Sequence, residues 1–233
     1  MAHVPRVLDQ MRICAIIPVY NEAERIGRLV TDLKRQNFDV VVIDDGSNDN
    51  SGWIAKEKGA VVITHQKKSG KGLSLRDGFD YAVRQNYHGV ITIDGDGQHD
   101  VDDIPRFVEK AKDGPNCVIT GSRMENPRGM PFIRLIVNKL MSVLISFVCK
   151  QRIPDTQCGF RFIGGEVLKS IHLSSSDFEI ESEVLIKASK KGFKIYSVPI
   201  KTIYSNECSK INPLTDTVRF FVYIFREAWN SKP

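Results

Sequence analysis

The sequence predicts an α/β protein in which a mostly parallel central sheet is flanked by helices. Apolar, β-branched runs recur along the chain, and amphipathic segments with short connections separate them. Strands and helices that alternate in this way form parallel βαβ units with right-handed crossovers. The length of 233 residues fits one such domain with a sizeable core. Ligands of these sheets bind outside the carboxyl ends of the strands, so the residues after each apolar run are the first candidates for function.

The first half of the chain alternates regularly between the two kinds of element. The apolar runs that predict strands are Ile13–Val19, 40–43, 60–64 and the run that begins at Val90. The amphipathic segments that predict helices begin near Glu22 and cover 51–58 and 73–83. Asn21 is placed to cap the first of these helices. Residues 67–72 are rich in glycine and lysine and are expected to form a loop.

The second half is less regular. The predicted helices are Ile104–Ala111 and Ile180–Lys190, and the predicted strands are 117–121, 155–162 and Lys194–Pro199. We find no internal repeat and no linker. We therefore expect a tail over 1–10, a single domain over 11–213 and an amphipathic C-terminal helix over 214–233.

Two long apolar segments leave two interpretations open. Phe132–Cys149 is mostly apolar, but a polar stripe recurs at every fourth position: Arg134, Asn138, Ser142, Ser146 and Lys150. Residues 214–229 also combine an apolar, aromatic face with arginines. Each segment is either a buried core helix or a helix that lies in a membrane interface. The uncharged run after Lys139 is shorter than the about 20 residues that span a bilayer, so we expect no transmembrane helix.

Composition narrows the partners and the compartment. The net charge of +5 fits an anionic substrate or a membrane surface, and it gives no argument for nucleic acid. The five cysteines form no CxxC pair, which argues against a zinc site and a disulfide framework and fits the cytoplasm. The first ten residues lack the apolar centre of a signal peptide.

The run from Val90 ends in Asp94-Gly-Asp96-Gly-Gln98, which is the clearest candidate site. Its side chains offer oxygen ligands at every second position, and such ligands suit Mg²⁺ or Mn²⁺ held together with substrate phosphates. An EF-hand is excluded, because its sixth position would be His99 instead of glycine and its twelfth would be Pro105 instead of glutamate.

Two more polar clusters follow strands that should end at the same edge. Tyr20-Asn21-Glu22 follows the first strand, and Asp44-Asp45 follows the second. The aspartates are suited to accept hydrogen bonds from a base or a ribose. Neither a P-loop nor a dinucleotide-binding glycine motif is present. Three polar clusters at one sheet edge predict a site for a nucleoside diphosphate.

The motifs occur in a recognisable order and spacing: Pro18-x-Tyr20-Asn21-Glu22, Asp44-Asp45-Gly46-Ser47, Gly70-Lys71-Gly72, Asp94-x-Asp96-x-Gln98-His99, Gly121-Ser122-Arg123, Gln157-Cys158-Gly159-Phe160-Arg161 and Ser209-Lys210-Ile211-Asn212-Pro213. In these motifs the chain resembles family 2 glycosyltransferases. More narrowly, it is similar to dolichyl-phosphate mannose synthase and to bacterial polyprenyl-phosphate glycosyltransferases. The similarity runs from Ile13 to about Pro213.

The resemblance implies a GT-A type nucleotide-binding fold, a nucleotide-sugar donor such as GDP-mannose or a UDP-sugar, and inversion at the anomeric carbon. The residues expected to bind the donor are Pro18, Tyr20, Asn21, Glu22, Asp44, Asp45, Lys71 and Asp94. Asp94, Asp96 and Gln98 are expected to hold the Mg²⁺ or Mn²⁺ that bridges the diphosphate.

The resemblance also implies a polyprenyl phosphate acceptor and work at the cytosolic membrane face. The two apolar segments would dock the protein there, alone or with a membrane-anchoring protein partner. The residues expected to bind the acceptor are Arg123, Arg134, Asn138, Gln157, Arg161, Ser209 and Lys210. For Arg134 or Arg161 taken alone, a solvated surface charge is an equal alternative.

The catalytic residues depend on the acceptor. A phosphate monoester is largely dianionic at neutral pH and attacks unaided, whereas a hydroxyl needs a base. Asp177, Glu179 and Glu181 are the candidates for that base, although carboxylates here also complement the dipole of the following helix. The dipole role is favoured for Glu181, and both roles stay open for Asp177 and Glu179. We name Asp96, Arg123, Asp177 and Glu179 as catalytic. The alternatives are a transferase with a glycan or other hydroxyl acceptor, and a non-catalytic subunit that binds nucleotide sugars.

Overall fold

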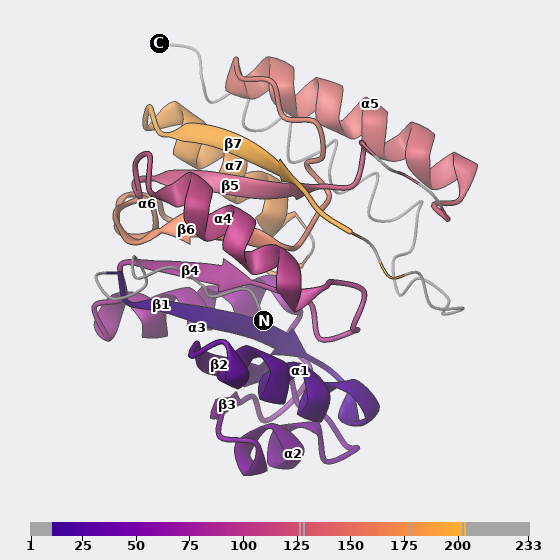
Figure 1. Ribbon diagram of the computed structural model, residues 1–233, viewed down its shortest axis with the longest axis vertical. Coiled ribbons are helices and arrows are strands. Elements are labelled where there is room, and N and C mark those ends of the chain that lie inside the picture. Colours follow the sequence, from indigo (N-terminus) through magenta and orange to yellow (C-terminus); the bar gives the residue numbers. More distant parts are fainter. Residues whose placement is uncertain (1–10, 126, 128, 178, 202, 204–233) are drawn as a thin grey trace.

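The computed structural model describes residues 11–125, 127, 129–177, 179–201 and 203. Its centre is a seven-stranded sheet with the order β3-β2-β1-β4-β6-β5-β7 (Figure 1). The strands are β1 (Ile13–Val19), β2 (Asp39–Asp44), β3 (Val61–Thr64), β4 (Gly89–Thr92), β5 (Cys117–Ser122), β6 (Arg161–Gly164) and β7 (Lys194–Pro199). The predicted α/β class is confirmed.

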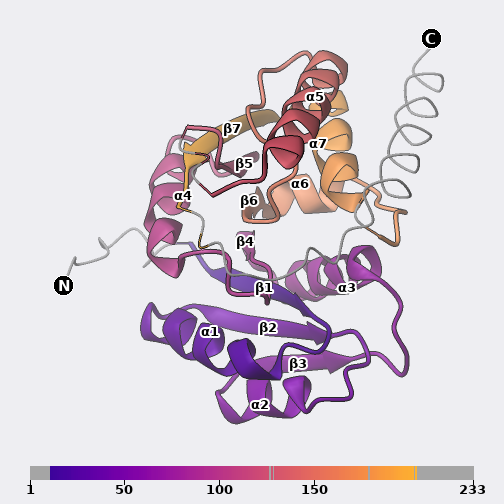
Figure 2. The ribbon, with the colours of Figure 1, turned by 90° about the vertical axis from the view of Figure 1, so that its right-hand side faces the viewer.

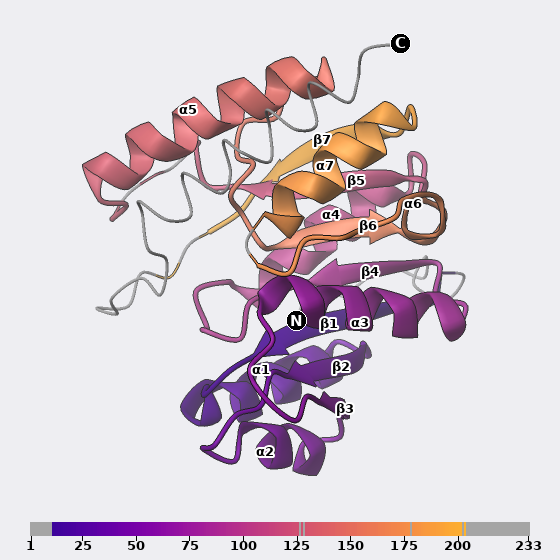
Figure 3. The same ribbon diagram turned by 180° about the vertical axis from the view of Figure 1, so that it is seen from behind.

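Helices cover both faces of the sheet (Figure 2). On one face lie α1 (Ala23–Arg35), α2 (Ser51–Glu57), the short 3₁₀ helix η1 (Val101–Asp103) and α4 (Ile104–Ala111). On the other lie α3 (Lys71–Arg84), α5 (Phe132–Cys149), α6 (Gly165–Ser170) and α7 (Ile180–Lys190), which face the viewer in Figure 3.

The apolar strand runs follow from this three-layer arrangement. In β1, Ile13, Ala15 and Ile17 point into the core under α1 and α4, whereas Cys14 and Ile16 point into the core under α3. A strand that is covered on both faces reads as a continuous apolar run because neither set of side chains meets water.

Strand direction differs between the two halves of the sheet. β1, β2, β3 and β4 are parallel, so their carboxyl ends meet at one edge. β6 runs antiparallel to both β4 and β5, and β5 pairs with β7 in parallel. The predicted strand at 155–162 was therefore placed too early, since only Arg161–Gly164 pairs, and α6 was not predicted.

The start of α1 corrects another prediction. Asn21 does not cap the helix: it has a φ of 55°, and its side-chain oxygen accepts the main-chain N–H of Asn48. The N–H groups at the start of α1 instead donate to side chains in the loop after β2 and at the first residue of α2. The N–H of Glu22 donates to Ser51 Oγ at 2.8 Å, and the N–H of Ala23 donates to Asp49 Oδ2 at 3.0 Å. The cap comes from a distant segment, which sequence spacing does not reveal.

α5 carries its polar stripe on the side that packs on the protein. Asn138 and Ser142 are buried, and Ser142 Oγ accepts the N–H of Thr156 at 3.0 Å. Apart from Lys139, the exposed side chains of α5 are apolar: Phe132, Ile133, Ile136, Val137, Leu140, Val143 and Phe147. Met141, Ile145 and Cys149 are buried in the core, so one face of α5 is that of a core helix and the other is an exposed, mostly apolar face. The second apolar segment, 214–229, lies outside the described residues.

α5 bears on the expectation that no helix spans a membrane. By length and composition, this helix of 18 residues with a mean hydropathy of 1.9 is long and apolar enough to cross a membrane. Its polar stripe, however, is committed to the protein, and the helix packs on α7.

Candidate active site

The predicted polar clusters meet at the carboxyl edge of the parallel strands. β1, β2 and β4 end side by side, and the N–H of Asp45 donates to the carbonyl oxygen of Val19 at 2.8 Å. The turn after β4 lies against the end of β1, because a Cβ added to Gly95 would touch Val19 and the carbonyl oxygen of Pro18. Tyr20, Asp45 and Asp94 thus belong to one region of the surface.

Asp45 is held by the loop that leads into α3. Its Oδ1 accepts the N–H of Ser69 at 2.7 Å, and its Oδ2 accepts the N–H of Gly70 at 2.9 Å. Oδ1 also lies 2.7 Å from Nδ1 of His65, whose Nε2 lies 2.9 Å from Asp77 Oδ2 on α3. Burial lowers the pKa of His65, but the hydrogen bonds to the two carboxylates outweigh it and raise that pKa above its usual value. His65 and Asp77 were not among the site residues predicted from the sequence.

The neighbours of Asp45 build the turn. Asp44 is buried, accepts the N–H of Ser47 at 2.9 Å and lies so close to Gly52 that a side chain there would collide with its carboxylate. The N–H of Asn21 donates to Ser47 Oγ at 3.0 Å, and Glu22 forms an ion pair with Arg25 at 3.2 Å. The ring of Tyr20 lies 4.1 Å below the ammonium of Lys68.

Lys71 connects the two halves of the site. Its Nζ lies 2.6 Å from Asp94 Oδ1 and 2.7 Å from Glu181 Oε1 on α7. Burial alone would lower the pKa of Lys71, but the two carboxylates raise it well above its usual range. Burial would likewise raise the pKa of Asp94, yet the Lys71 charge and the contact with His99 hold it well below its usual range. Both side chains are therefore charged at neutral pH.

Asp96 and Gln98 form the turn that follows Asp94. Asp96 Oδ1 accepts the main-chain N–H of Gln98 at 3.0 Å. Burial and the nearby negative charge of Asp94 raise the pKa of Asp96. A carboxylate whose pKa is raised by a neighbouring carboxylate is suited to share a divalent cation with it.

A complete metal site is not formed by these side chains alone. Among the described residues, no group of three or more His, Cys, Asp or Glu side chains has the arrangement of a metal centre. Mg²⁺ usually takes one or two carboxylates from the protein and fills the remaining positions with phosphate oxygens and water. Asp94 and Asp96 fit that partial ligand set.

The loop that precedes β6 forms the wall beside Asp94. A Cβ at Gly159 would collide with the Asp94 carboxylate, and the carbonyl oxygen of Gly159 accepts a hydrogen bond from Thr92 Oγ1 at 2.7 Å. His99 is buried against Phe160 with 5.2 Å between ring centroids, and its Nε2 lies 3.7 Å from Asp94 Oδ2. Gly159 and His99 were seen only as parts of motifs.

Two arginines predicted to bind the acceptor are committed to the interior. Arg161 is 2% exposed, and its guanidinium donates to the carbonyl oxygens of Cys158, Thr156 and Glu181. This burial removes Arg161 from the acceptor set, and it also excludes the alternative of a surface charge. Arg123 is 5% exposed and forms a double hydrogen bond with Asp155 through Nε at 2.7 Å and Nη2 at 2.9 Å.

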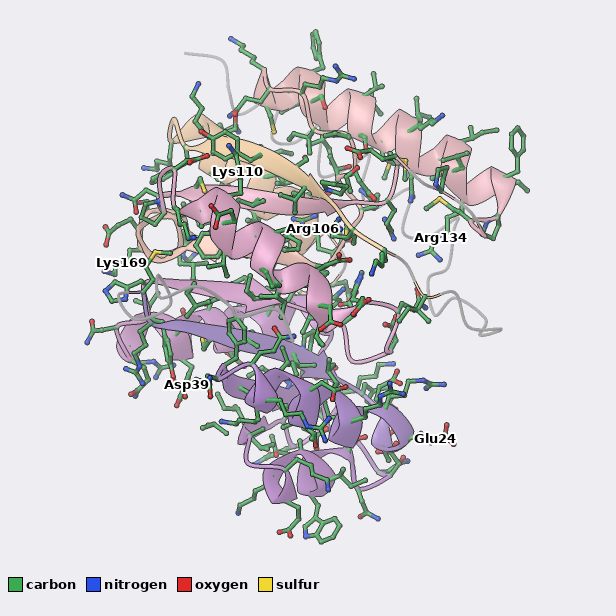
Figure 4. All side chains as sticks on the ribbon, in the orientation of Figure 1. Glu24, Asp39, Arg106, Lys110, Arg134 and Lys169 are labelled. Atoms are coloured by element: carbon green, nitrogen blue, oxygen red, sulfur yellow. The ribbon has the colours of Figure 1, made fainter. Side chains whose placement is uncertain are left out.

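The remaining acceptor candidates lie next to Asp155, on α5 or outside the described residues. Gln157 is partly exposed, and its N–H donates to Asp155 Oδ1 at 3.1 Å. Asn138 is buried, and its Nδ2 has no hydrogen-bond partner among the described residues. Arg134 is partly exposed and extends from α5 on the side toward which β1 and β4 run (Figure 4). Ser209 and Lys210 are outside the described residues.

The structure gives the three acidic candidates near the start of α7 different surroundings. Glu181 reaches the site through Lys71, whereas its predicted role was to complement the helix dipole. Asp177 lies beside the start of α3, where the N–H groups of Gly72 and Leu73 donate to the carbonyl oxygen of Ser176 at 2.8 and 3.2 Å. Glu179 is partly exposed, and its carbonyl oxygen accepts the N–H of Glu183.

The fold that carries this site is of the GT-A type. The structure resembles glucosyl-3-phosphoglycerate synthase from Mycobacterium tuberculosis, solved in complex with Mn²⁺, UDP and phosphoglyceric acid. The likeness has a TM-score of 0.73 at 17% identity and covers 99% of this chain and 82% of that chain. At this identity it establishes the fold alone.

Sequence comparison then establishes the family. Residues 14–171 match the model of glycosyl transferase family 2, and the chain belongs to this family of enzymes. It is 32% identical over 216 residues to the UDP-N-acetylglucosamine–dolichyl-phosphate N-acetylglucosaminyltransferase of Methanococcus voltae, covering 83% of this chain and 86% of the relative. It is 30% identical over 208 residues to the polyprenol monophosphomannose synthase of Mycolicibacterium smegmatis, covering 83% and 78%.

Proposed function

We propose that this glycosyltransferase moves a sugar, with inversion, from a nucleoside diphosphate donor to a polyprenyl phosphate at the cytosolic membrane face. The observation that carries the proposal is the meeting of Asp45, Asp94 and Asp96 at one sheet edge, with Lys71 among them. The relatives named for dolichyl-phosphate and polyprenol acceptors support the choice of acceptor.

In this proposal the donor lies across the ends of β1, β2 and β4. Asp45 accepts a hydrogen bond from the base or ribose, and Tyr20 and Pro18 line the same pocket. Asp94 and Asp96 are the residues that would hold Mg²⁺ or Mn²⁺. Such an ion would supply positive charge to oppose the negative charge that develops on the leaving diphosphate. Lys71 adds a fixed positive charge beside it, 2.6 Å from Asp94.

The acceptor approaches from the side of α5. The exposed apolar face of α5 suits contact with lipid, and an outward apolar face on a helix whose polar stripe is buried has no other partner among the described residues. Arg134 and Nδ2 of Asn138, which has no hydrogen-bond partner in the described part of the chain, are groups of α5 suited to a phosphate. A dianionic phosphate needs no base to attack the anomeric carbon.

The reaction is tested with purified protein, Mn²⁺ or Mg²⁺, and labelled GDP-mannose and UDP-sugars, with and without polyprenyl phosphate. We expect a lipid-linked labelled product only when both substrates and a divalent cation are present. Asp96→Asn should abolish product. Asp102→Asn changes an exposed residue of η1 and should not abolish product. Product that forms equally well in EDTA would contradict the proposed metal.

Membrane contact is tested by co-sedimentation with anionic liposomes. Val143→Ser combined with Phe147→Ser removes two exposed apolar side chains from α5 and should lower the bound fraction. Trp53→Ser is the matched control, because Trp53 is also an exposed aromatic residue but lies on α2 at the opposite end of the molecule (Figure 1). Equal binding by all three proteins would contradict the proposed docking face.

A hydroxyl acceptor is the second candidate, and one observation favours it. Glu181 places a buried carboxylate in the site, where a general base would be needed. Transfer to a glycan or phosphoglycerate hydroxyl in the same assay, lost in Glu181→Gln, would support this candidate. Retention of lipid-linked product by Glu181→Gln would support a phosphate acceptor.

A further inference from the structure

The imidazole of His65 lies between two carboxylates from different elements. Nδ1 is 2.7 Å from Asp45 Oδ1 at the end of β2, and Nε2 is 2.9 Å from Asp77 Oδ2 on α3. An ionised carboxylate only accepts hydrogen bonds, so each ring nitrogen must carry a proton to form both contacts. The geometry therefore selects the imidazolium form of His65.

This bridge converges on the loop that surrounds Asp45. The same carboxylate accepts the N–H groups of Ser69 and Gly70, and the N–H of His65 donates to the carbonyl oxygen of Asp44 at 2.8 Å. The side chains of His65 and Asp45 are 10% and 6% exposed, so these bonds are shielded from water. His65 thus ties the ends of β2 and β3 to the start of α3.

We propose that His65 is a positioning residue of the donor site, whose doubly protonated ring holds Asp45 and the 69–70 main chain in the arrangement that receives a nucleoside diphosphate. The proposal rests on the proposed function, in which Asp45 contacts the donor. When the ring loses one proton, one carboxylate faces a nitrogen lone pair and its hydrogen bond is lost. The donor pocket then loosens while the reacting groups at Asp94 and Asp96 keep their own contacts.

The charges around the ring give the direction of the pH effect. The charged groups that face the ring are Asp45, from the end of β2, and Asp77, from α3. In the loop after β3, Lys67 and Lys68 are exposed, and Lys68 lies over the ring of Tyr20. The carboxylates raise the pKa of His65. The bridge is therefore present at low pH and is lost as the pH rises through that raised pKa.

The first measurement needs no ligand. The pKa of His65 is followed by NMR of its Cε1–H resonance, assigned with His65→Gln among the five histidines of the chain. We expect a pKa above the usual 6.5, a lower pKa in Asp77→Asn, and no change in Asp80→Asn, an exposed carboxylate on the same helix. A pKa at or below 6.5 in the parent would overturn the proposal.

The second measurement is the affinity for UDP and GDP with Mg²⁺ from about pH 6 to about pH 9. At the acidic end, His65→Gln should bind about tenfold more weakly than the parent, as expected for loss of a charged hydrogen bond. This ratio should fall toward one as the pH rises. Taking the ratio cancels the ionisation of the ligand itself, and the exposed His172→Gln is the matched control.

Asp77→Asn covers the case in which His65→Gln fails to fold. This variant keeps the ring and should move the fall in affinity of the protein to lower pH. A ratio that is the same at every pH, or a fall that Asp77→Asn does not move, would overturn the role of His65 alone. Failure of the parent to bind either nucleotide at any pH would overturn the proposed function as well.

Discussion

In the described part of the chain, the Lys71 and Arg123 clusters of largely buried opposite charge are built differently. In the first, the single ammonium nitrogen of Lys71 contacts Asp94 and Glu181, and the three side chains are 10% to 25% exposed. In the second, the planar guanidinium of Arg123 contacts both oxygens of Asp155, and the two side chains are 5% and 0% exposed.

The difference separates a site from a scaffold. An ammonium group is a compact charge without a fixed contact geometry. Another cation can therefore replace it, and a phosphate can replace its carboxylate partners. A guanidinium group, by contrast, fixes both partners in a plane. We therefore interpret the Lys71 cluster as the one that exchanges partners with ligands. The Arg123 cluster holds the loop before β6 in place, with Arg161 bound to three main-chain carbonyl oxygens of neighbouring segments.

The largest effect is expected from breaking the scaffold cluster. Asp155→Asn leaves the guanidinium of Arg123 buried without its counter-charge, so the free energy of unfolding should fall by about 3 to 5 kcal/mol. Urea denaturation measures this loss. Asp113→Asn removes an exposed ion pair with Lys110 and is the control that should change little. A loss no larger than that of the control would remove the distinction between the clusters.

Removing the carboxylate of Asp96, the proposed metal ligand next to the site cluster, should affect turnover instead of stability. We expect Asp96→Asn to lower kcat by about a hundredfold or more, because it removes stabilisation of the charge that develops on the diphosphate. Its midpoint of urea unfolding should stay near that of the parent. Kinetics at saturating Mn²⁺ and the denaturation curve are measured on the same preparation. A stable variant with near-parental kcat would contradict the assignment of Asp96.

Removing the cation of the site cluster should have an intermediate effect. Lys71→Met retains the length of the side chain but leaves Asp94 and Glu181 without their shared counter-ion. Affinity for a nucleoside diphosphate should fall by about tenfold, since one charged contact is lost. Calorimetric titration of UDP or GDP measures it. Unfolding of the variant at ordinary temperature would mean that this cluster is scaffold too.

The smallest effect concerns acid pH. Burial would raise the pKa of Asp155, but the hydrogen bonds and charge of Arg123 lower it below its unfolded value of 3.8. A lowered carboxylate pKa stabilises the fold above the unfolded pKa, and this contribution is lost as the pH falls below it. The stability difference between parent and Asp155→Asn should therefore narrow by about 1 kcal/mol between neutral pH and about pH 3. A constant difference across this range would contradict the lowered pKa.

Most of the half of the sheet that contains β1, β2, β3 and β4 could be predicted because its signals are local. Apolar runs such as Ile13–Val19 predicted parallel strands, and the polar residues after them, including Asp45 and Asp94, predicted the edge at which they meet. The second half of the chain was predicted less well. The antiparallel β6, the short α6 and the loop before Arg161 depend on contacts between distant segments, and no periodicity marks them.

The contacts between side chains were the second feature that could not be predicted from the sequence. The sequence singled out Arg161 as a phosphate ligand because an isolated arginine looks the same whether it is buried or exposed. Glu181 was given a helix-dipole role because its distance from Lys71 is a property of the folded chain. The expectations for Ser209, Lys210 and the 214–229 segment lie outside the described residues and stay predictions.

The sequence by itself determined the sheet, its functional edge and the family, because these follow from the order of apolar runs and from residues fixed to strand ends. Only the tertiary structure decided which charges meet. It paired Lys71 with Asp94 and Glu181, placed His65 between Asp45 and Asp77, and turned the polar stripe of α5 inward. The physical reason is that ion pairs and burial depend on distances of a few ångströms between segments far apart in the chain, and local residue patterns carry no record of those distances.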